Sequence, residues 1–394
     1  MTVARLTALG LCCALGNNKQ QVWHNAITGS RAGMRWRDDL LTSGKAVIAG
    51  EVSGDLPDLS VWPVHYQSRN NQLAALAYQQ IAEDVATVRQ QYGAARIAVI
   101  IGTSTSGIAE GERAMQHYMT QQCYPPGYHY QIQEMLAPAN FIARLADVSG
   151  PCYAISTACS SSARALISAR TLLQANLADA VIVGGVDSLC QLTFNGFAAL
   201  ESVAAAHCQP FSQQRDGINI GEGAALFLMQ KHGSDIALLG CGASSDAHHM
   251  SAPQPEGMGA INAITQACQQ AGITPAQLDY INLHGTATPL NDSMESKALA
   301  TLALTQVAAS SSKSMTGHTL GAAGAIEAAL CWLTLSDYNT GQHLVPHCWD
   351  GQADPALPVL SLVSIGQQQA VSYCLSNSFA FGGNNVALIL GKTI

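Results

Sequence analysis

The sequence predicts an α/β protein made of two similar halves. Apolar, β-branched runs that end in glycine, such as residues 96–102, indicate strands buried on both faces. Segments with helical spacing alternate with these runs, and the strand, helix and strand of residues 152–187 imply a right-handed parallel crossover. The alternation resumes after the turn-like residues 231–235. We therefore expect halves of residues 1–233 and 234–394, although no repeated sequence motif is visible.

Within each half the elements alternate in a regular order. Predicted strands cover residues 3–13, 45–53, 96–101, 152–155, 179–187 and 224–229, then 236–241, 278–283, 306–310 and the last strands within 371–390. Predicted helices cover residues 19–26, 70–91 and 160–177, then 260–271, 292–302 and 320–335. Residues 107–136, rich in Tyr, Gln and His, are expected to form helices and loops over the surface.

The composition limits the classes of protein to which the chain can belong. Charged residues make up 11% of the 394, against roughly 25% in soluble domains, so part of the surface is expected to be covered by another subunit. A net charge of -8 and the absence of any Lys/Arg run exclude a nucleic-acid footprint. The 12 cysteines are scattered through apolar segments and no signal peptide or membrane-length apolar span is apparent. These features predict a reduced, cytoplasmic protein.

Cys159 occupies a favourable position for a nucleophile. A short apolar strand, a turn of small residues and then helical spacing from Ser160 place the thiol at the start of a helix. The positive end of a helix dipole stabilises a thiolate, and small neighbours admit a substrate. An inert buried thiol fits this local sequence equally well.

His284 follows a predicted strand and precedes Gly285, Thr286 and Thr288. Binding and catalytic residues of α/β sheets gather at such strand ends, although a satisfied loop histidine is the common alternative. Asp292 is expected to cap the next helix.

Two further stretches carry polar residues in unusual settings. Lys313 and His318 precede a helix that begins almost entirely with Gly and Ala, and Glu327 lies within that apolar helix. A buried carboxylate needs a cationic partner, for which we expect Lys313, unless Glu327 faces solvent. The tail segment 377–385 contains a glycine pair and is either a hairpin or a loop that offers N–H groups to an oxyanion. Residues 343–348 hold two His and one Cys, but the loop is an improbable metal site.

Four segments together resemble the β-ketoacyl-acyl-carrier-protein synthases, in order and over essentially the whole chain. They are Thr157-Ala158-Cys159-Ser160-Ser161, His284-Gly285-Thr286-Ala287-Thr288, Lys313-Ser314-Met315-Thr316-Gly317-His318 and Asn377-Ser378-Phe379-Ala380-Phe381-Gly382-Gly383. The resemblance implies a thiolase-like fold, with two αβαβα-type halves in a five-layered body. Its Cys-His-His set is similar to that of elongating synthases; initiating synthases have Asn for the second His, and thiolases use a second Cys.

The resemblance implies a decarboxylative Claisen condensation. Cys159 would accept an acyl chain from a carrier-protein thioester, and the N–H groups of Cys159 and Phe381 would form the oxyanion hole. Neutral His284 and His318 would then donate hydrogen bonds to the malonyl thioester as decarboxylation forms an enolate. The chain would grow by two carbons.

The supporting residues are likewise implied. Lys313 with Glu327 would orient His318, and Thr286 with Thr288 would contact the phosphopantetheine arm. Substrate contacts are also implied for Phe379, Phe381 and Thr105. No metal or organic cofactor is expected, because the carrier protein brings the phosphopantetheine.

Small departures from the family pattern bear on the pathway. Ala380 and Asn384 stand where Gly and Thr are usual, Ile218 replaces an aromatic residue, and Thr105 is small at the acyl pocket. These differences weaken an assignment to housekeeping fatty-acid synthesis and leave room for a dedicated polyketide synthase, such as an aryl polyene type; the choice between the two pathways stays open. Starter, chain length and carrier remain open.

The expected partners are an acyl carrier protein and a second ketosynthase-fold subunit. The dimer could join identical chains or a chain and a related silent subunit, with residues 107–136 reaching the neighbour's acyl pocket. Two other functions stay possible: a non-catalytic chain-length-factor subunit and a biosynthetic thiolase.

Overall fold

The computed structural model describes residues 3–393 and contains a ten-stranded sheet with the order β11-β10-β12-β13-β9-β1-β8-β6-β4-β5. The first half of the chain supplies one side of it. Its strands are β1 (Ala4–Cys13), β4 (Ile97–Gly102), β5 (Cys152–Ile155), β6 (Ala180–Asp187) and β8 (Gly223–Gln230). β4 runs parallel to β5 and β6, whereas β8 is antiparallel to both β6 and β1.

The second half repeats this pattern strand for strand. Its strands are β9 (Ile236–Ser245), β10 (Tyr280–Asn282), β11 (Ala308–Ser310), β12 (Tyr373–Ala380) and β13 (Asn384–Lys392). β10 runs parallel to β11 and β12, whereas β13 is antiparallel to β12 and β9. A brief β1–β9 contact joins the halves. The duplication expected from element order is therefore confirmed, because both halves share one strand order and one set of directions.

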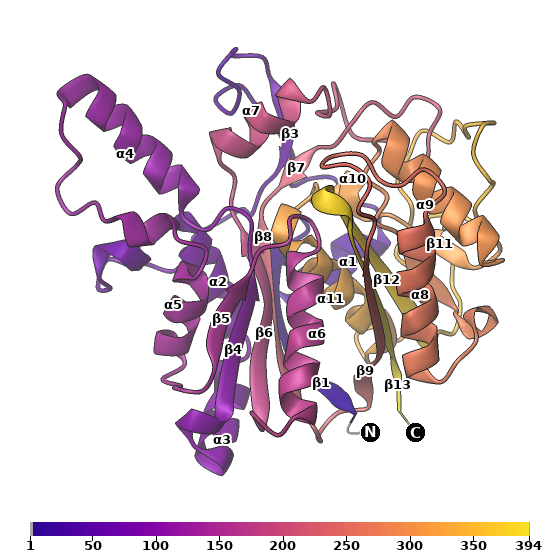
Figure 1. The fold of residues 1–394 in the computed structure, drawn as a ribbon, viewed down its shortest axis with the longest axis horizontal. Coiled ribbons are helices and arrows are strands. Elements are labelled where there is room, and N and C mark those ends of the chain that lie inside the picture. Colours follow the sequence, from indigo (N-terminus) through magenta and orange to yellow (C-terminus); the bar gives the residue numbers. More distant parts are fainter. Residues whose placement is uncertain (1–2, 394) are drawn as a thin grey trace.

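Helices form three layers around and between the two halves of the sheet (Figure 1). The middle layer consists of α6 (Ser161–Gln174) and α11 (Ala323–Leu335). The first half is covered by α2 (Arg69–Gln79), α3 (Ala82–Tyr92) and α5 (Ala137–Leu145), and the second by α8 (Met258–Ala271) and α9 (Pro289–Thr301). This is the predicted five-layered α/β body.

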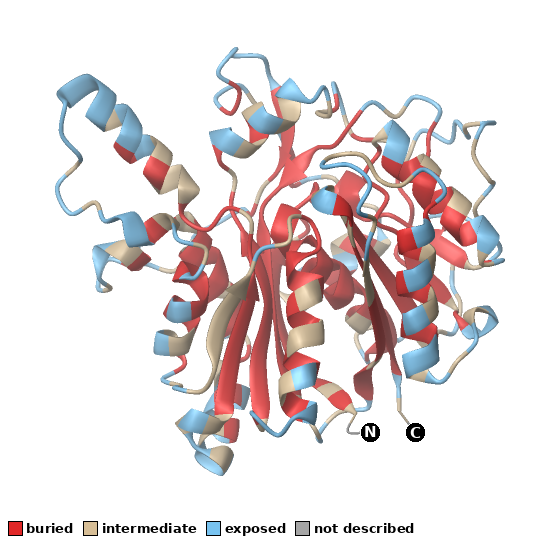
Figure 2. Cartoon of the chain, viewed as in Figure 1, coloured by how far each residue is buried: buried red, intermediate tan, exposed pale blue. Residues whose placement is uncertain are grey.

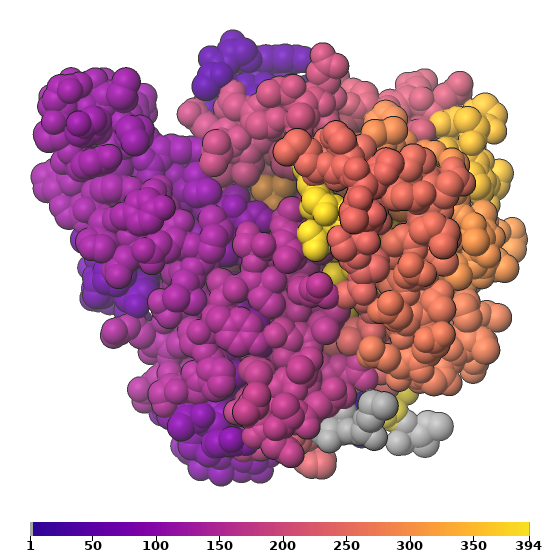
Figure 3. All heavy atoms as spheres, viewed as in Figure 1, coloured from indigo at the N-terminus to yellow at the C-terminus, as the bar shows by residue number. Residues whose placement is uncertain are grey.

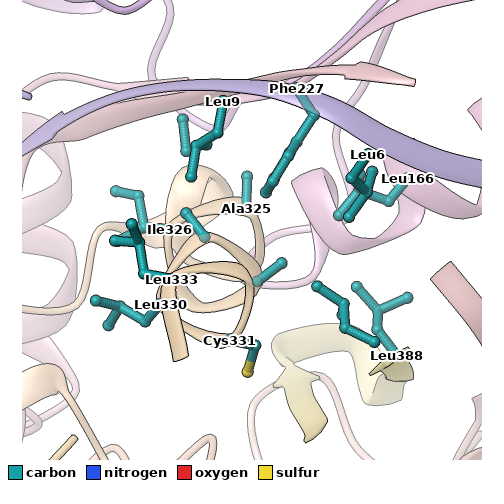
Figure 4. Packing of buried hydrophobic residues seen from close by; sticks show 14 of the residues in the cluster. Leu6, Leu9, Leu166, Phe227, Ala325, Ile326, Leu330, Cys331, Leu333 and Leu388 are labelled. Carbon is teal, nitrogen blue, oxygen red and sulfur yellow. The ribbon is translucent and has the colours of Figure 1, made fainter. Parts of the chain in front are cut away.

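The central helix α11 is apolar on all sides because sheet strands pack around it. Leu6 and Phe227 approach it from the first half and Leu388 from the second (Figure 4). Nearly every residue of the helix is buried, including the charged Glu327. Such a helix has no solvent face, so Glu327 must find its partner inside the protein.

The structure differs from the prediction in one helix and in one small sheet. The helix expected over residues 70–91 breaks into α2 and α3, because Gln80 turns its side chain to β1 and donates to the carbonyls of Leu11 and Asn17. The sequence analysis also missed β2 (Met34–Arg37), which pairs with β3 (Val47–Gly50) in a small sheet completed by β7 (Ile220–Gly221).

β5 was expected to be buried but forms one edge of the large sheet. All four of its residues are half-buried, and Figure 2 shows this strand beside fully buried neighbours. At the upper left of Figure 1, α4 (Ile108–Gln121) projects from the body as the predicted surface segment. Met115 and Met119 on α4 are 49% and 69% exposed. This side of the molecule therefore presents both an open strand edge and exposed apolar side chains.

The remaining helices are α1 (Lys19–Ile27), α7 (Gln191–Ala199) and the short α10 (Lys313–Thr316). Within residues 3–393, no helix is both long and apolar enough to span a membrane.

Candidate active site

Cys159 lies on a sharp turn between β5 and α6. Ala158 has φ +51°, a left-handed value that non-glycine residues rarely adopt, and α6 begins two residues after Cys159. Gly102 lets the helix start so close to the sheet, since a Cβ there would lie 2.3 Å from the Ser162 nitrogen. The turn fixes Cys159 in the wall of a pocket, where 6% of the residue is exposed.

The resting state of this thiol differs from the expected thiolate. Burial raises the pKa of Cys159 to about 12, while the positive charge of Lys313 and the Cys159 backbone N–H act in the opposite direction. Glu327 and Asp187 raise the pKa further. A thiol with a pKa raised this far is neutral at physiological pH, and acyl transfer therefore requires a proton acceptor.

His284 is held from both sides at the end of β10. Its backbone N–H donates to Glu295 Oε1 at 2.9 Å, and Lys313 Nζ lies 3.4 Å from its Nδ1. Burial, then Lys313 and His318, lower the pKa of His284 well below its usual value. Because an ammonium group can only donate, Nδ1 is the acceptor and Nε2 carries the proton.

His318 stands edge-on to His284, with ring centroids 5.4 Å apart and planes 83° apart. Its backbone is pinned, the N–H donating to Asn219 O at 2.6 Å and the carbonyl accepting from Gly221 N at 2.9 Å. Neither ring nitrogen has a hydrogen-bond partner among the described residues. Burial and Lys313 lower the pKa of His318 well below normal. A neutral imidazole with both nitrogens free is thus available to a substrate.

Lys313 and Glu327 form the buried ion pair that the sequence predicted. Only 1% of Lys313 and 2% of Glu327 is exposed. Lys313 also donates to the His284 carbonyl. The sequence analysis expected Lys313 to orient His318, but in the structure Lys313 holds His284. Burial raises the pKa of Glu327 to about 7, against the opposing charge of Lys313.

Replacing Lys313 alone should destabilise the fold, because it leaves a carboxylate buried without a partner. We expect Lys313→Ala to lower the free energy of unfolding by about 3–5 kcal/mol in urea titration. Lys313→Met combined with Glu327→Leu should recover most of that loss, because both charges are gone, but not the decarboxylation activity. Equal stability of the single and double variants would contradict the pairing.

The sequence analysis missed a second buried carboxylate. Glu295 accepts hydrogen bonds from the N–H groups of His284 and Gly285 and from Asn377 Nδ2. Burial raises its pKa to about 7, and these donors act against the rise. Two acids three residues apart, Asp292 and Glu295, directly after the His284 loop were the available signal.

Asp292 does not cap α9, contrary to expectation. Thr288 is the N-cap residue, and Asp292 lies one turn into the helix. Its carboxylate accepts from the N–H groups of Thr286 and Phe211, at 3.1 Å and 2.8 Å. Asp292 therefore braces the loop that carries His284 and Thr286.

The pocket has a volume of about 340 Å³ and opens at the seam between the halves. Seven of the predicted site residues line it: Cys159, His284, Thr286, Thr288, His318, Phe379 and Phe381. Figure 3 shows atoms of the C-terminal segment in this seam. The structure thus gathers His284, His318, the predicted nucleophile Cys159 and the tail loop around one space.

Thr105 lies apart from this pocket. It is fully buried, and its hydroxyl donates to Asp187 Oδ1 at 2.8 Å. The structure therefore shows a contact of Thr105 with Asp187, and the substrate contact implied for Thr105 stays a prediction. Among the described residues, no three His, Cys, Asp or Glu side chains form a group suited to a metal ion.

Two family models cover most of the chain. Residues 5–234 match the N-terminal domain of β-ketoacyl synthases, and residues 236–344 match the C-terminal domain. The chain belongs to the β-ketoacyl synthase family. It is therefore an acyltransferase, and its predicted nucleophile Cys159, the two histidines and the tail loop line one pocket.

Relatives in this family match the chain almost end to end. The 3-oxoacyl-[acyl-carrier-protein] synthase 2 of Synechocystis sp. is 30% identical, with 98% of this chain and 97% of the relative covered. The enzyme of the same name from Staphylococcus aureus is 29% identical at the same coverage.

A solved structure is closer in sequence. The complex of the ketosynthase ApeO with its chain length factor ApeC, from Xenorhabdus doucetiae, contains a chain that is 45% identical. The TM-score is 0.94, and 100% of this chain and 98% of that chain are covered. The match confirms the thiolase-like ketosynthase fold.

Proposed function

We propose that this synthase extends an acyl chain by two carbons, condensing malonyl-acyl carrier protein with an acyl group held on Cys159. The observation that carries this function is the neutral histidine pair, His284 and His318, in one pocket with a thiol on a strained turn. A thiol supports covalent transfer, and two neutral imidazoles support an enolate without protonating it.

In the first half-reaction the Cys159 sulfur attacks the acyl thioester. The thiol proton passes to a neutral ring nitrogen of His318, which has no other partner, and then to the departing carrier thiolate. The N–H groups of Cys159 and Phe381 stabilise the tetrahedral oxyanion. The products are acyl-Cys159 and a free carrier thiol.

In the second half-reaction malonyl-carrier protein enters with its arm along Thr286 and Thr288. Nε2–H of His284 and an N–H of His318 donate to the thioester oxygen as carbon dioxide leaves and the enolate forms. The enolate carbon attacks the carbonyl carbon of acyl-Cys159, and the bond from that carbon to the Cys159 sulfur breaks. The released Cys159 thiolate then takes a proton. Lys313 keeps His284 in the required tautomer through its contact with Nδ1.

Two other functions are less well supported. A chain-length factor lacks the nucleophile, whereas Cys159 here lines the histidine pocket. A thiolase would need a second cysteine in the tail loop, where this sequence has Ala380 and Phe381.

Mass spectrometry of the intact protein tests the function. The purified chain is incubated with a panel of acyl-carrier proteins and then with malonyl-carrier protein. We expect an acyl adduct in the first step and a 3-oxoacyl-carrier product two carbons longer in the second. Neither adduct nor product with any member of the panel would refute the condensing activity.

The similarity to a ketosynthase that works with a chain length factor supports a polyketide pathway, of which an aryl polyene pathway is one type. We assign the enzyme to the cytoplasm, with an acyl carrier protein as the substrate carrier and with no metal or organic cofactor of its own. Its second subunit is a related ketosynthase-fold chain, of chain-length-factor type.

The open β5 edge and the projecting α4 helix support this subunit contact. A permanent interface of this kind buries more than about 2,000 Å² and is rich in apolar area. We expect the dimer with this related subunit to persist at nanomolar concentration in analytical ultracentrifugation.

Exposed residues on α4 allow a test that leaves the fold intact. Met115→Lys with Met119→Lys should dissociate the dimer, because both side chains are exposed in the single chain. Val359→Lys is the matched control, since Val359 is 80% exposed on a different segment. An active wild-type monomer would refute the assembly.

A further inference from the structure

His347 is a buried histidine outside the pocket, and both of its ring nitrogens are engaged. Nδ1 accepts a hydrogen bond from the Ser311 N–H at 3.1 Å, and Nε2–H donates to the Pro210 carbonyl at 2.9 Å. Only 4% of the residue is exposed, and it does not line the pocket. With one nitrogen accepting and one donating, His347 must be neutral and can ligate no metal.

Ser311 in turn contacts the loop that carries His284 and the start of the helix that carries Lys313. Its hydroxyl donates to the Gly285 carbonyl at 2.7 Å, next to His284. The Ser311 hydroxyl oxygen also accepts a hydrogen bond from the Lys313 backbone N–H at 3.3 Å. One serine therefore fixes the His284 loop relative to the start of α10, and His347 holds the backbone of that serine.

The Pro210 contact braces the opposite side of the same loop. Phe211 follows Pro210, donates its N–H to Asp292 and lies 6.1 Å from the His347 ring, centroid to centroid. A Cβ on Gly285 would lie 3.0 Å from the Phe211 ring and 2.6 Å from Ser311 Cβ. The His284 loop is thus enclosed between Phe211 and Ser311, both of which His347 ties down.

We propose that His347 is a positioning residue for the decarboxylation step, setting the separation of His284 from Lys313 through Ser311. This role rests on the proposed function, because it concerns the histidine that holds the malonyl thioester. None of these contacts reaches Cys159, so the acyl-transfer step is spared. Burial also lowers the pKa of His347 to about 4, which keeps the neutral ring in place at physiological pH.

Measuring the two half-reactions separately tests the proposal. For His347→Ala we expect the rate of carbon dioxide release from malonyl-carrier protein to fall about 10–100-fold, as for other small misplacements of catalytic groups. The KM for malonyl-carrier protein and the rate of self-acylation should stay within about twofold of wild type. A merely structural loss would lower both half-reactions together.

Three other variants keep the test decisive. His347→Asn should restore most of the decarboxylation rate, because its side-chain oxygen can replace Nδ1 as acceptor for the Ser311 N–H. Ser311→Ala should reproduce the selective defect, and it serves if His347→Ala fails to fold. His343→Ala, on the same segment but half-exposed, is the matched control and should behave as wild type.

Equal loss of both half-reactions, or an unchanged decarboxylation rate in His347→Ala and Ser311→Ala, would overturn the proposal. The result that would refute the proposed function is distinct from these outcomes, because the wild-type chain would then show neither half-reaction.

Discussion

Replacing Cys159 with alanine should reduce self-acylation by at least about a thousandfold, which is the largest effect expected for any single change. In the proposed mechanism this thiol is the nucleophile, and removing it leaves no thiol at the strained turn to take the acyl group. Carbon dioxide release from malonyl-carrier protein should continue, because that step depends on His284 and His318. Intact-protein mass spectrometry and a carbon dioxide assay measure the two outcomes.

Cys190 offers a matched control for this variant. It is the N-cap residue of α7, so a second cysteine also lies at the start of a helix. Cys190 is buried but contacts Thr193 and does not line the histidine pocket. Cys190→Ala should therefore acylate normally. An acyl group that persists in Cys159→Ala and maps to another cysteine would show that the nucleophile is misassigned.

The histidine variants should show the opposite pattern: a large loss of carbon dioxide release and a smaller effect on acylation. His284→Ala and His318→Ala should each lower carbon dioxide release by about 10²–10³-fold, the usual cost of losing one donor to a developing oxyanion. Acylation of Cys159 should remain measurable because its thiol and turn are intact, although His318→Ala should slow this step, since His318 accepts the thiol proton in the proposed mechanism. His318→Gln retains an N–H donor and should recover part of the rate. Decarboxylation close to the wild-type rate in either alanine variant would exclude that residue from the enolate site.

The same histidines predict a pH dependence. Their pKa values lie well below the ordinary 6.5, so both rings stay neutral as pH falls from 7.5 to 6. Decarboxylation by the folded enzyme should therefore change little over this range. The histidines should lower stability below pH 6.5, because the unfolded chain then binds protons that the folded histidines do not, whereas Glu295 and Glu327, with buried pKa values of about 7, act in the opposite direction. A decarboxylation rate that titrates near pH 6.5 would contradict the buried, neutral state.

The sequence by itself determined the fold class, and it singled out Cys159, His284 and His318, which the structure brings into one pocket. Strands buried on both faces were visible as apolar runs, since no polar residue is tolerated there. The Lys313–Glu327 pair was also predictable, because a lone carboxylate in an apolar helix needs a cation. These inferences rest on local pattern and on the cost of burying charge.

Only the tertiary structure decided how these parts act on one another. It shows that Lys313 contacts His284, that Glu295 supports the same loop, and that the Cys159 thiol is neutral at rest. It also places β5 at the sheet edge and ends α2 at Gln80. Each outcome depends on which distant segments pack together. Burial and hydrogen-bond partners, and with them pKa values, are set by that packing and not by neighbours in the sequence.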